Sequence, residues 1–447
     1  MKHISNHPFA RPEVCGRSSG SQFIRCRLPP SLRSSVIPEV DVKSHVKVAL
    51  LTAGRDKHYA YGMAKALIEK GLSPDIIGSD DLDTAEWHGS TRVRFFNLRG
   101  DMSENASLQK KIARVLIYYV RLILYAAAAE PKIFHILWNN KFETFDRVPL
   151  MLYYKLLGKK TILTVHNVNA GTRDSNDTWF NRLTLNIQYQ LCDHLFVHTQ
   201  RMKRELIEQF YVSASSISVI PYGINNAVPN TNLSSNEARQ RLRVPEEDRV
   251  ILFFGNIAPY KGLEYLIDAF QQVMVGGERY RLIIAGNLKD CESYWNSLRG
   301  MLGSHPNRDR IIQKIQFIPD SETEIYFKAA DVLVLPYRHI FQSGVLFLGY
   351  RFGLPVIASD VGALRDEIID GKTGFVCRPE DSDDLALVIE KYFSSDLYRG
   401  LGSNRQGIIE YAYQRSSWEV VAQLTENVYM KLLGERPSDE GCRAISH

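Results

Sequence analysis

One loop of the sequence combines a lysine with glycines and a proline between an apolar run and a helical segment. It covers residues 255–262 and reads GNIAPYKG. Gly255 permits a tight exit from a strand. Lys261 places a cation at the amino end of the next helix, where N–H groups and the helix dipole already favour an anion. The loop predicts a diphosphate site, although a solvated lysine beside an ordinary turn would have the same local sequence.

A second loop has the residue types of another anion site. It covers 337–345, YRHIFQSGV, between the apolar run DVLVLP and a helix expected at 346–352. Ser343 is expected to cap that helix, and Gly344 lets the backbone approach a ligand closely. The N–H groups at the start of the helix would then bind an anion. A plain helix cap is the alternative interpretation.

The composition is that of an ordinary globular protein. The 447 residues are 45% hydrophobic and 23% charged, which excludes wholesale disorder, collagen and coiled coil and leaves room for two or three domains. The net charge of +5 reflects 55 basic and 50 acidic residues, a mild excess that suits phosphates or an anionic membrane surface. The six cysteines form no Cys-x-x-Cys pair, so neither a zinc site nor a disulfide framework is expected.

Residues 1–45 differ from the rest of the chain. They are rich in Arg, Ser and Pro and lack the apolar stretch of a secretory signal. We interpret them as a flexible leader, with a transit peptide as the alternative. No run reaches the 18 or so apolar residues of a membrane span, so we expect a cytoplasmic protein.

From residue 45 on, short apolar runs alternate with helical periodicity. The pattern predicts strands at 45–51, 73–77, 93–96, 133–138, 161–165, 194–198 and 217–220, then at 250–254, 281–285, 315–318, 331–335, 355–358 and 374–377. Such alternation specifies parallel sheets covered by helices on both faces. We expect an α/β fold with two doubly wound Rossmann-like domains, 46–225 and 226–415, and a helical segment, 416–447, that packs back on the first.

Ligands of open parallel sheets bind outside the carboxyl ends of the strands. Two such domains facing each other would form a cleft there, with both anion-binding loops on one side. Several polar residues in loops after first-domain strands are suited by position to recognise acceptor hydroxyls: Asn139, Asn140, Asn167 and Arg173.

The order and spacing of several segments resemble one family. Residues 249–390 contain, in this order, ILFFGNIAPYKGLEYLIDAF, YRLIIAG, KAADVLVLPY, FGLPVIASDVGALRDEI and DGKTGFVCRPED. The first half matches more loosely, through KIFHILWNN, KKTILTVHNVNAG, CDHLFVHTQRMKREL and ISVIPYGIN. The sequence is similar to the family 4 retaining glycosyltransferases, whose GT-B fold has two Rossmann-like domains facing across a cleft.

The resemblance implies that a nucleoside diphosphate sugar binds mainly to the second domain and an acceptor mainly to the first. The family's diphosphate lysine falls on Lys261, and its histidine near the donor sugar falls on His166. The glycine turn after the first strand falls on Gly54. A basic residue that usually follows the strand glycine is replaced here by Asn256.

The sequence departs from the family at two further positions. Many members have glutamates eight positions apart, one on the donor sugar and one on the ribose, where this chain has Ile340 and Leu348. Neither side chain accepts a hydrogen bond, which leaves the donor's identity open. Arg338 or Arg351 is the candidate second cation. The nearest polar replacements belong to Gln342, Ser343, Gly344 and Val345.

By the resemblance, a retaining transfer needs no protein nucleophile, metal or cofactor. Lys261 and loop N–H groups would stabilise the leaving diphosphate, whose oxygen would take the proton of the incoming hydroxyl on the same face. Neither anion-binding loop contains an Asp-x-Asp motif that would hold a metal against the diphosphate.

The helical segment 108–129 is a candidate membrane contact. A basic and aromatic edge on it could lie on an anionic bilayer and reach a lipid-linked sugar, and an ordinary core helix is the alternative. The residues of this edge are Lys110, Lys111, Arg114, Tyr118, Tyr119, Arg121 and Tyr125.

These observations predict an enzyme that moves a hexosyl group from a nucleoside diphosphate sugar to a saccharide or lipid-linked acceptor, in surface polysaccharide or glycolipid synthesis. It would act in the cytoplasm, with peripheral contact at the inner face of the plasma membrane and no nucleic acid partner. Two other interpretations stay open. A sugar-nucleotide 2-epimerase would need an acid and a base, and no carboxylate pair can be assigned. A catalytically silent nucleotide-sugar-binding partner is suggested by Ile340 and Leu348.

Overall fold

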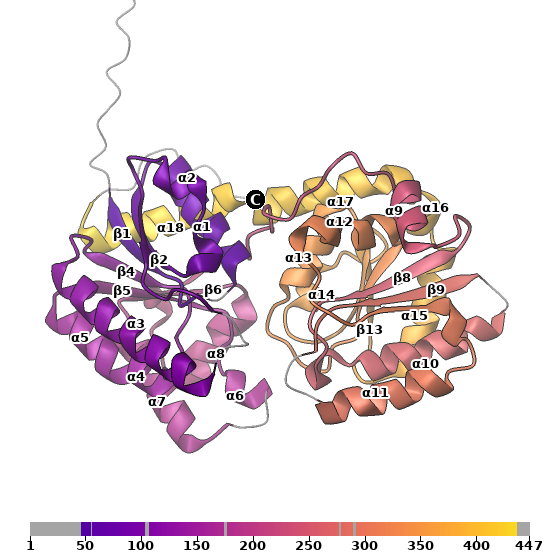
Figure 1. The fold of residues 1–447 in the computed structure, drawn as a ribbon, viewed down its shortest axis with the longest axis horizontal. Coiled ribbons are helices and arrows are strands. Elements are labelled where there is room, and N and C mark those ends of the chain that lie inside the picture. Colours follow the sequence, from indigo (N-terminus) through magenta and orange to yellow (C-terminus); the bar gives the residue numbers. More distant parts are fainter. Residues whose placement is uncertain are drawn as a thin grey trace, which may run out of the picture. The chain divides into compact units, whose positions relative to one another are not determined.

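Two parallel sheets with helices between their strands make up the described part of the chain (Figure 1). The computed structural model describes residues 46–54, 56–102, 107–173, 177–276, 279–288 and 292–435. The predicted α/β class with two doubly wound sheets is confirmed. The leader, 1–45, and the end of the chain, 436–447, lie outside the described residues.

The first sheet has seven strands in the order β3-β2-β1-β4-β5-β6-β7. All its neighbouring strands are parallel. The order reverses between β1 and β4, which is where doubly wound sheets bind ligands. The strands are β1 (Lys47–Leu51), β2 (Ser73–Gly78), β3 (Arg94–Asn97), β4 (Ile133–Ile136), β5 (Lys160–Val165), β6 (His194–Val197) and β7 (Ile217–Val219).

Helices cover both faces of this sheet, because each connection crosses from one strand to a parallel neighbour. The longest, α3, shares a hydrophobic core with α5, α7 and α8, whereas α1 packs into a separate core. The helical elements are α1 (Lys57–Glu69), η1 (Asp80–Leu82), α2 (Ala85–His88), α3 (Leu108–Ala128), α4 (Glu143–Phe145), the π-helical turn η2 (Asp146–Leu150), α5 (Met151–Leu156), α6 (Ala170–Arg173), α7 (Trp179–Leu191), α8 (Gln200–Phe210) and η3 (Ala214–Ser216).

The second sheet has six parallel strands in the order β10-β9-β8-β11-β12-β13. Its order reverses between β8 and β11, the strands that precede the two predicted anion-binding loops. The strands are β8 (Arg249–Phe254), β9 (Tyr280–Ala285), β10 (Ile311–Lys314), β11 (Val332–Leu335), β12 (Val356–Ser359) and β13 (Gly374–Cys377).

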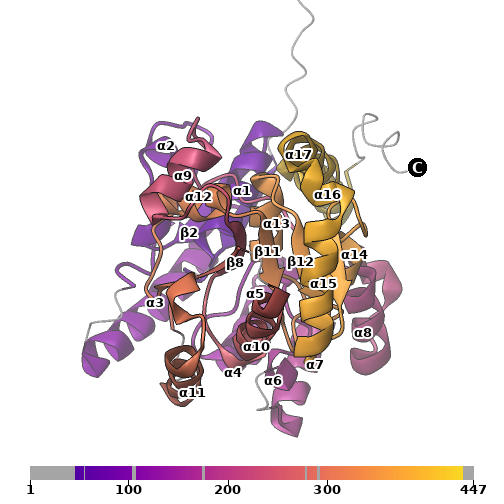
Figure 2. The same cartoon turned by 90° about the vertical axis from the view of Figure 1, so that its right-hand side faces the viewer.

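Helices α10 and α15 pack side by side against the second sheet (Figure 2). The helical elements of this half are α9 (Ser235–Leu242), η4 (Pro259–Lys261), α10 (Leu263–Val273), η5 (Met274–Gly276), α11 (Glu292–Ser304), η6 (Arg308–Arg310), α12 (Asp320–Ala329), α13 (Gly344–Arg351), α14 (Leu364–Glu367), α15 (Ser382–Ser394), α16 (Asp396–Arg399) and α17 (Leu401–Ser416).

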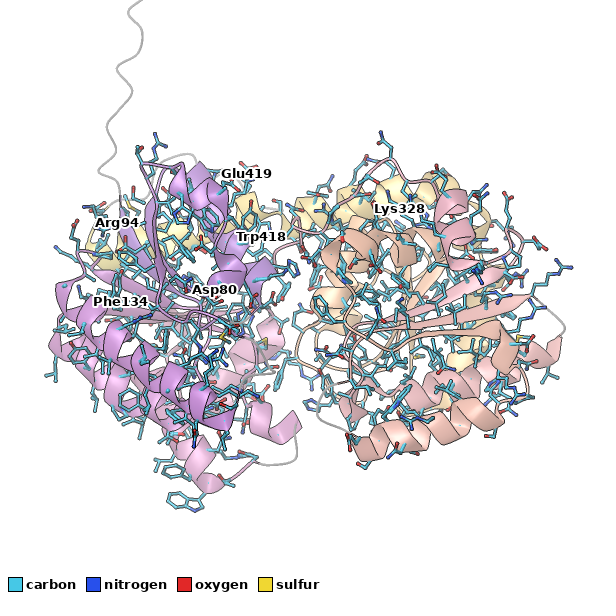
Figure 3. The ribbon with its side chains drawn as sticks, in the orientation of Figure 1. Asp80, Arg94, Phe134, Lys328, Trp418 and Glu419 are labelled. Carbon is cyan, nitrogen blue, oxygen red and sulfur yellow. The ribbon has the colours of Figure 1, made fainter. Side chains whose placement is uncertain are left out.

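The last helix, α18 (Trp418–Leu433), packs against α1. Trp418 begins it (Figure 3), and its indole N–H donates to the carbonyl oxygen of Ile224 at 2.6 Å. A Cβ atom on Gly62 of α1 would lie 2.2 Å from the Trp418 ring, and one on Gly223 would lie 2.5 Å from it. Both glycines therefore leave the space that the indole fills.

One predicted strand differs from the structure. The strand expected at 315–318 is wrong, because β10 ends at Lys314 opposite Ala285, the last residue of β9, and the chain beyond has no strand to pair with. Helix α5 follows directly on the π-helical turn η2, which contains Pro149, a residue without an N–H group. Ser417 separates α17 from the last helix, and its side chain caps α18 by accepting from Val420 N.

Candidate functional site

A cavity of about 620 Å³ gathers most of the residues that the sequence predicted for the site. Its wall comes from both halves of the chain, after the carboxyl ends of β4, β5, β8 and β11 and at the start of α1. We call it the main pocket. The predicted residues that line it are His166, Asn167, Gly255, Asn256, Lys261, Ile340, Gln342, Ser343, Gly344, Val345 and Leu348.

Lys261 belongs to the wall of the main pocket and not to the open surface. Its side chain is 7% exposed. Its Nζ donates to the Tyr337 hydroxyl at 2.6 Å and lies 4.0 Å from the centre of that ring. The lysine ends the short turn η4, and Gly262 follows with a φ of +62°. The turn thus holds a cation at the amino end of α10.

The two predicted anion-binding loops touch at Gly262. A Cβ atom there would lie 2.1 Å from the carbonyl oxygen of Pro336, the residue that precedes the second loop. Gly255 has a φ of +103°, and a Cβ on it would lie 3.3 Å from the Val345 side chain. Glycine is thus favoured where strand β8 ends, because residues with a side chain rarely adopt this positive φ.

Helix α13 begins at Gly344, two residues earlier than expected. Its N–H groups at Gly344 and Val345 are in the first turn, where the helix itself offers no acceptor. The prediction that Ser343 caps this helix with its side chain is wrong, because no such hydrogen bond forms. The Ser343 hydroxyl lies 3.4 Å from that of Tyr337 instead. A Cβ on Gly344 would come within 3.2 Å of the Tyr222 hydroxyl.

His166 lies among aromatic rings at the other side of the main pocket. It stacks on Trp138 with ring centres 4.3 Å apart and an angle of 2° between the planes, and Tyr59 meets it edge-on. Burial is the main cause that lowers the pKa of His166 far below its usual range, with further contributions from His198 and His135. The imidazole is therefore neutral at physiological pH.

The hydrogen bonds of His198 assign the proton on His166. His198 Nδ1 lies 3.2 Å from the carbonyl oxygen of Ile220, which can only accept, so Nδ1 carries the proton. Burial lowers the pKa of His198 to about 4, so its Nε2 is an acceptor. That nitrogen lies 3.1 Å from His166 Nδ1, which must donate. By this assignment His166 Nε2 is an acceptor, and it has no hydrogen-bond partner among the described residues.

Two carboxylates that the sequence analysis did not single out also line the main pocket. Asp56 caps α1 by accepting from Tyr59 N, and it accepts from the Tyr222 hydroxyl at 3.0 Å. Asp320 begins α12 and pairs with Lys57 at 3.1 Å and with His58 at 3.2 Å. Both precede or open a helix, which is the sequence signal that could have found them. His198 and Trp138 carry no such local signal.

Some predicted residues lie outside the main pocket. Gly54 lines a neighbouring cavity of about 350 Å³ that shares Asp56 and Lys57 with it. Asn139 exchanges two amide hydrogen bonds with Gln188, at 3.0 and 2.8 Å. Asn140 donates from its backbone N–H to Asp146 at 2.5 Å.

These two asparagines line a separate cavity of about 10 Å³ within the first core, where burial raises the pKa of Asp146 to about 6. The side chain of Arg173 lies outside the described residues. The structure therefore does not bring Asn139 and Asn140 to the same wall as Asn167, and their role in acceptor binding stays a prediction.

Neither candidate second cation lines the main pocket. Arg338 pairs with Glu264 and, at 3.8 Å, with Glu380. Arg351 donates to Asn226 Oδ1 and to the carbonyl oxygen of Val228, both at 2.7 Å. The Arg338 guanidinium is thus held by carboxylates, and that of Arg351 by the oxygens of Asn226 and Val228, outside the pocket lining.

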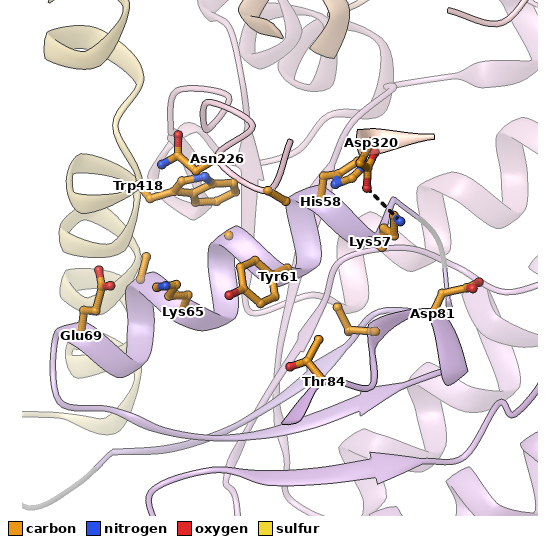
Figure 4. Close-up of a pocket in the computed structure, with 14 residues that line it drawn as sticks. Lys57, His58, Tyr61, Lys65, Glu69, Asp81, Thr84, Asn226, Asp320 and Trp418 are labelled. Atoms are coloured by element: carbon orange, nitrogen blue, oxygen red, sulfur yellow. Dashed lines mark ion pairs between the residues drawn. The ribbon is translucent and has the colours of Figure 1, made fainter. Parts of the chain in front are cut away.

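A further cavity of about 480 Å³ lies along α1 (Figure 4). The Lys57–Asp320 ion pair, His58 and Trp418 line both this cavity and the main pocket. Within the described part of the chain, no group of His, Cys, Asp or Glu side chains could hold a metal ion. Cys192 and Cys377 are free thiols, and the other four cysteines lie outside the described residues.

Comparisons with protein families assign both halves of the chain. The family described as "Glycosyl transferases group 1" matches residues 234–415, and the one described as "Glycosyltransferase Family 4" matches residues 57–228. The chain belongs to the family 4 glycosyltransferases. The range 234–415 includes Lys261 and the loop 337–345 before α13 (the α13 loop), and the range 57–228 includes His166. Residues from both matched ranges thus line the main pocket of this glycosyltransferase.

Named relatives agree with this assignment. A D-inositol 3-phosphate glycosyltransferase of Corynebacterium aurimucosum is 27% identical over 295 residues, which are 64% of this chain and 68% of the relative. Two further relatives of that description are covered over 49% and 63% of their length.

Solved structures share the fold. Sucrose-phosphate synthase from Thermosynechococcus elongatus has a TM-score of 0.70 at 20% identity, over 87% of this chain and 99% of that one. HepE of Anabaena in complex with UDP and glucose has a TM-score of 0.67 at 17% identity, over 87% of this chain and 100% of that one. The two doubly wound sheets of this glycosyltransferase therefore form the GT-B fold.

Proposed function

We propose that this glycosyltransferase transfers a hexosyl group, with retention, from a nucleoside diphosphate sugar to a saccharide or lipid-linked acceptor. One observation carries the proposal: the Lys261 ammonium, the first turn of α13 and His166 line a single cavity of about 620 Å³. That volume is typical of small-molecule sites. The complex of the GT-B protein HepE with UDP and glucose supports a uridine diphosphate sugar as the first donor to test.

The chemistry of the pocket wall suggests how the donor lies. Its diphosphate would bind where Lys261 and the N–H groups of Gly344 and Val345 converge, since a cation and a helix amino end both attract phosphate oxygens. Its sugar would lie toward His166, whose ring lines the same pocket. Ile340 and Leu348 contribute hydrocarbon to the wall, so they offer no hydrogen bond to the donor.

Positioning and electrostatic stabilisation would supply the catalysis. As the bond to the sugar breaks, negative charge develops on the leaving phosphate beside Lys261 and the start of α13. A leaving phosphate oxygen would take the proton of the acceptor hydroxyl on the same face of the sugar. The two carboxylates of the wall, Asp56 and Asp320, are engaged by Tyr222 and by Lys57 and His58. They are thus poorly placed to act as a nucleophile or as the acid–base pair of an epimerase.

A screen of nucleoside diphosphate sugars tests the proposal. The full chain is incubated with uridine, guanosine, adenosine and thymidine diphosphate hexoses, with and without saccharide acceptors and with a chelator present. We expect release of the diphosphate by one donor and an unchanged anomeric configuration in the product by NMR. Binding by calorimetry without turnover would favour a silent partner, and conversion of the free sugar nucleotide to its C2 epimer would favour an epimerase.

A further inference from the structure

Helix α3 carries a row of exposed apolar side chains. They recur every three or four residues for most of the helix, which places them along one strip as the helix turns. The exposed fractions are 72% for Leu108, 47% for Ile112, 53% for Leu116, 49% for Ile117, 58% for Val120 and 64% for Leu124. We call this set the α3 row. Soluble monomers rarely expose contiguous apolar surface of this kind without a partner.

The aromatic edge predicted from the sequence is wrong. Tyr118 and Tyr119 are buried in the first core together with Leu122 and Ala126. Tyr125 donates to Asp75 Oδ2 at 2.7 Å. The tyrosines thus anchor α3 to the sheet, and aliphatic side chains face outward instead.

The charge of α3 has one sign. Its 21 residues, LQKKIARVLIYYVRLILYAAA, include four basic residues and no acidic one. Lys110, Lys111 and Arg121 are exposed. With about 100° of turn per residue, Lys110 and Arg121 fall on a strip next to the α3 row. An apolar strip flanked by basic groups is the pattern of a helix that lies in the surface of an anionic membrane.

Helix α5 adds to the apolar character of this side of the sheet. It lies beside α3, where the Tyr153 hydroxyl donates to the carbonyl oxygen of Ile123 at 3.1 Å. Leu152 and Leu156 on α5 are 46% and 86% exposed. Both helices belong to the same core. None of the described helices combines the length and the apolar composition that crossing a bilayer requires.

We propose that the α3 row docks on an anionic bilayer, with Leu116, Val120 and Leu124 in the headgroup region and Lys110 and Arg121 against lipid phosphates. A second copy of the chain fits this surface poorly in a symmetric dimer with antiparallel α3 helices, because that dimer would place the basic strip of one copy beside that of the other. The inference rests on the proposed function in one respect: docking on the membrane would bring the enzyme to a lipid-linked acceptor. Since α3 follows β3 and precedes β4, its first turns lie at the same edge of the sheet as the main pocket.

Flotation of the full chain with vesicles tests the docking surface. The probes are vesicles of phosphatidylcholine alone and of equal parts phosphatidylcholine and phosphatidylglycerol, at moderate salt. The test variant is Val120→Glu with Leu124→Glu. The matched control is Val275→Glu with Leu387→Glu, which adds the same charge at exposed apolar positions of the second half. We expect wild type and control to float with the anionic vesicles and the test variant to bind them at least tenfold more weakly.

The proposal would be overturned by no flotation of the wild type with anionic vesicles, by equal flotation of the test variant, or by a dimer in solution that the test variant disperses. An acidic polypeptide that binds the row while vesicles do not would do the same. Release of diphosphate from the donor in solution, measured on the same proteins, keeps this test separate from that of the proposed function. A docking variant that retains this activity but not flotation separates the membrane surface from the pocket.

Discussion

Replacement of Lys261 by methionine tests the proposed contact between the Lys261 ammonium and the donor diphosphate. Methionine keeps an unbranched stem of similar length over the Tyr337 ring and removes only the ammonium. A hydrogen bond between a charged donor and a phosphate contributes about 1.5–3 kcal/mol. At about 1.4 kcal/mol per tenfold change, the Kd for the donor should rise roughly 10- to 150-fold.

Calorimetric titration with the donor found in the screen measures this loss. Arg338→Met is the matched control, because it removes one positive charge from the next loop while the Arg338 guanidinium is held by Glu264 and Glu380 outside the pocket. We expect the control to change the Kd less than about threefold, the size of a screened surface charge. Thermal unfolding of both variants checks that the fold is intact.

Two results would refute the reasoning. A Lys261→Met protein that melts like the wild type and binds the donor within twofold would show that the ammonium does not contact the diphosphate. Equal weakening by Lys261→Met and Arg338→Met would show that only the net charge of the region matters.

Three further predictions concern the scaffold of the site. Gly262→Ala should destabilise the protein by about 2 kcal/mol or more, because alanine disfavours a positive φ and its Cβ would meet the Pro336 carbonyl oxygen at 2.1 Å. Urea unfolding measures this loss of stability. An unchanged unfolding midpoint would contradict the loop geometry. Trp418→Ala should lower the free energy of unfolding by about 3–5 kcal/mol, since the indole fills the space left by Gly62 and Gly223. A melting temperature that does not fall would contradict this prediction. Burial lowers the pKa of His198 from its ordinary 6.5 to about 4, so the unfolded chain binds this proton first and stability is lost as pH falls from about 6.5 toward 4, by about 1.4 kcal/mol per pH unit for this group. Urea titrations at pH 7.5, 6 and 5 should therefore show a smaller loss of unfolding free energy with falling pH for His198→Gln than for the wild type. Equal losses in the two proteins would contradict a neutral, buried His198.

Much of the fold and one side of the site could be predicted from local sequence. The alternation of apolar runs and helical segments gave every strand of both sheets except β10, whose apolar neighbours at 315–318 have the same pattern but no partner. Lys261 and the α13 loop were found because consecutive residues specify a glycine-containing turn between a strand and a helix. The loop glycines were found for the same reason.

The other side of the site could not be found that way. His198 comes from a different strand than His166, and only their 3.1 Å approach shows that one orients the proton of the other. Asn139 and Asn140 occupy loops that look suitable for an acceptor, yet Gln188 pairs with the amide group of Asn139 and Asp146 accepts from the amide N–H of Asn140. Tyr118 and Tyr119 resemble a membrane edge in sequence, and only the direction of the helix face shows that they are buried.

The sequence by itself determined the parallel α/β architecture, the places of the two predicted anion-binding loops and the positive charge of α3, because periodicity, glycine positions and side-chain charge are properties of neighbouring residues. Tertiary structure alone decided which polar groups remain available to a ligand and which form hydrogen bonds within the protein. The physical reason is that a hydrogen bond or a buried surface needs a partner, and in this chain the partners are commonly dozens of residues away along the backbone.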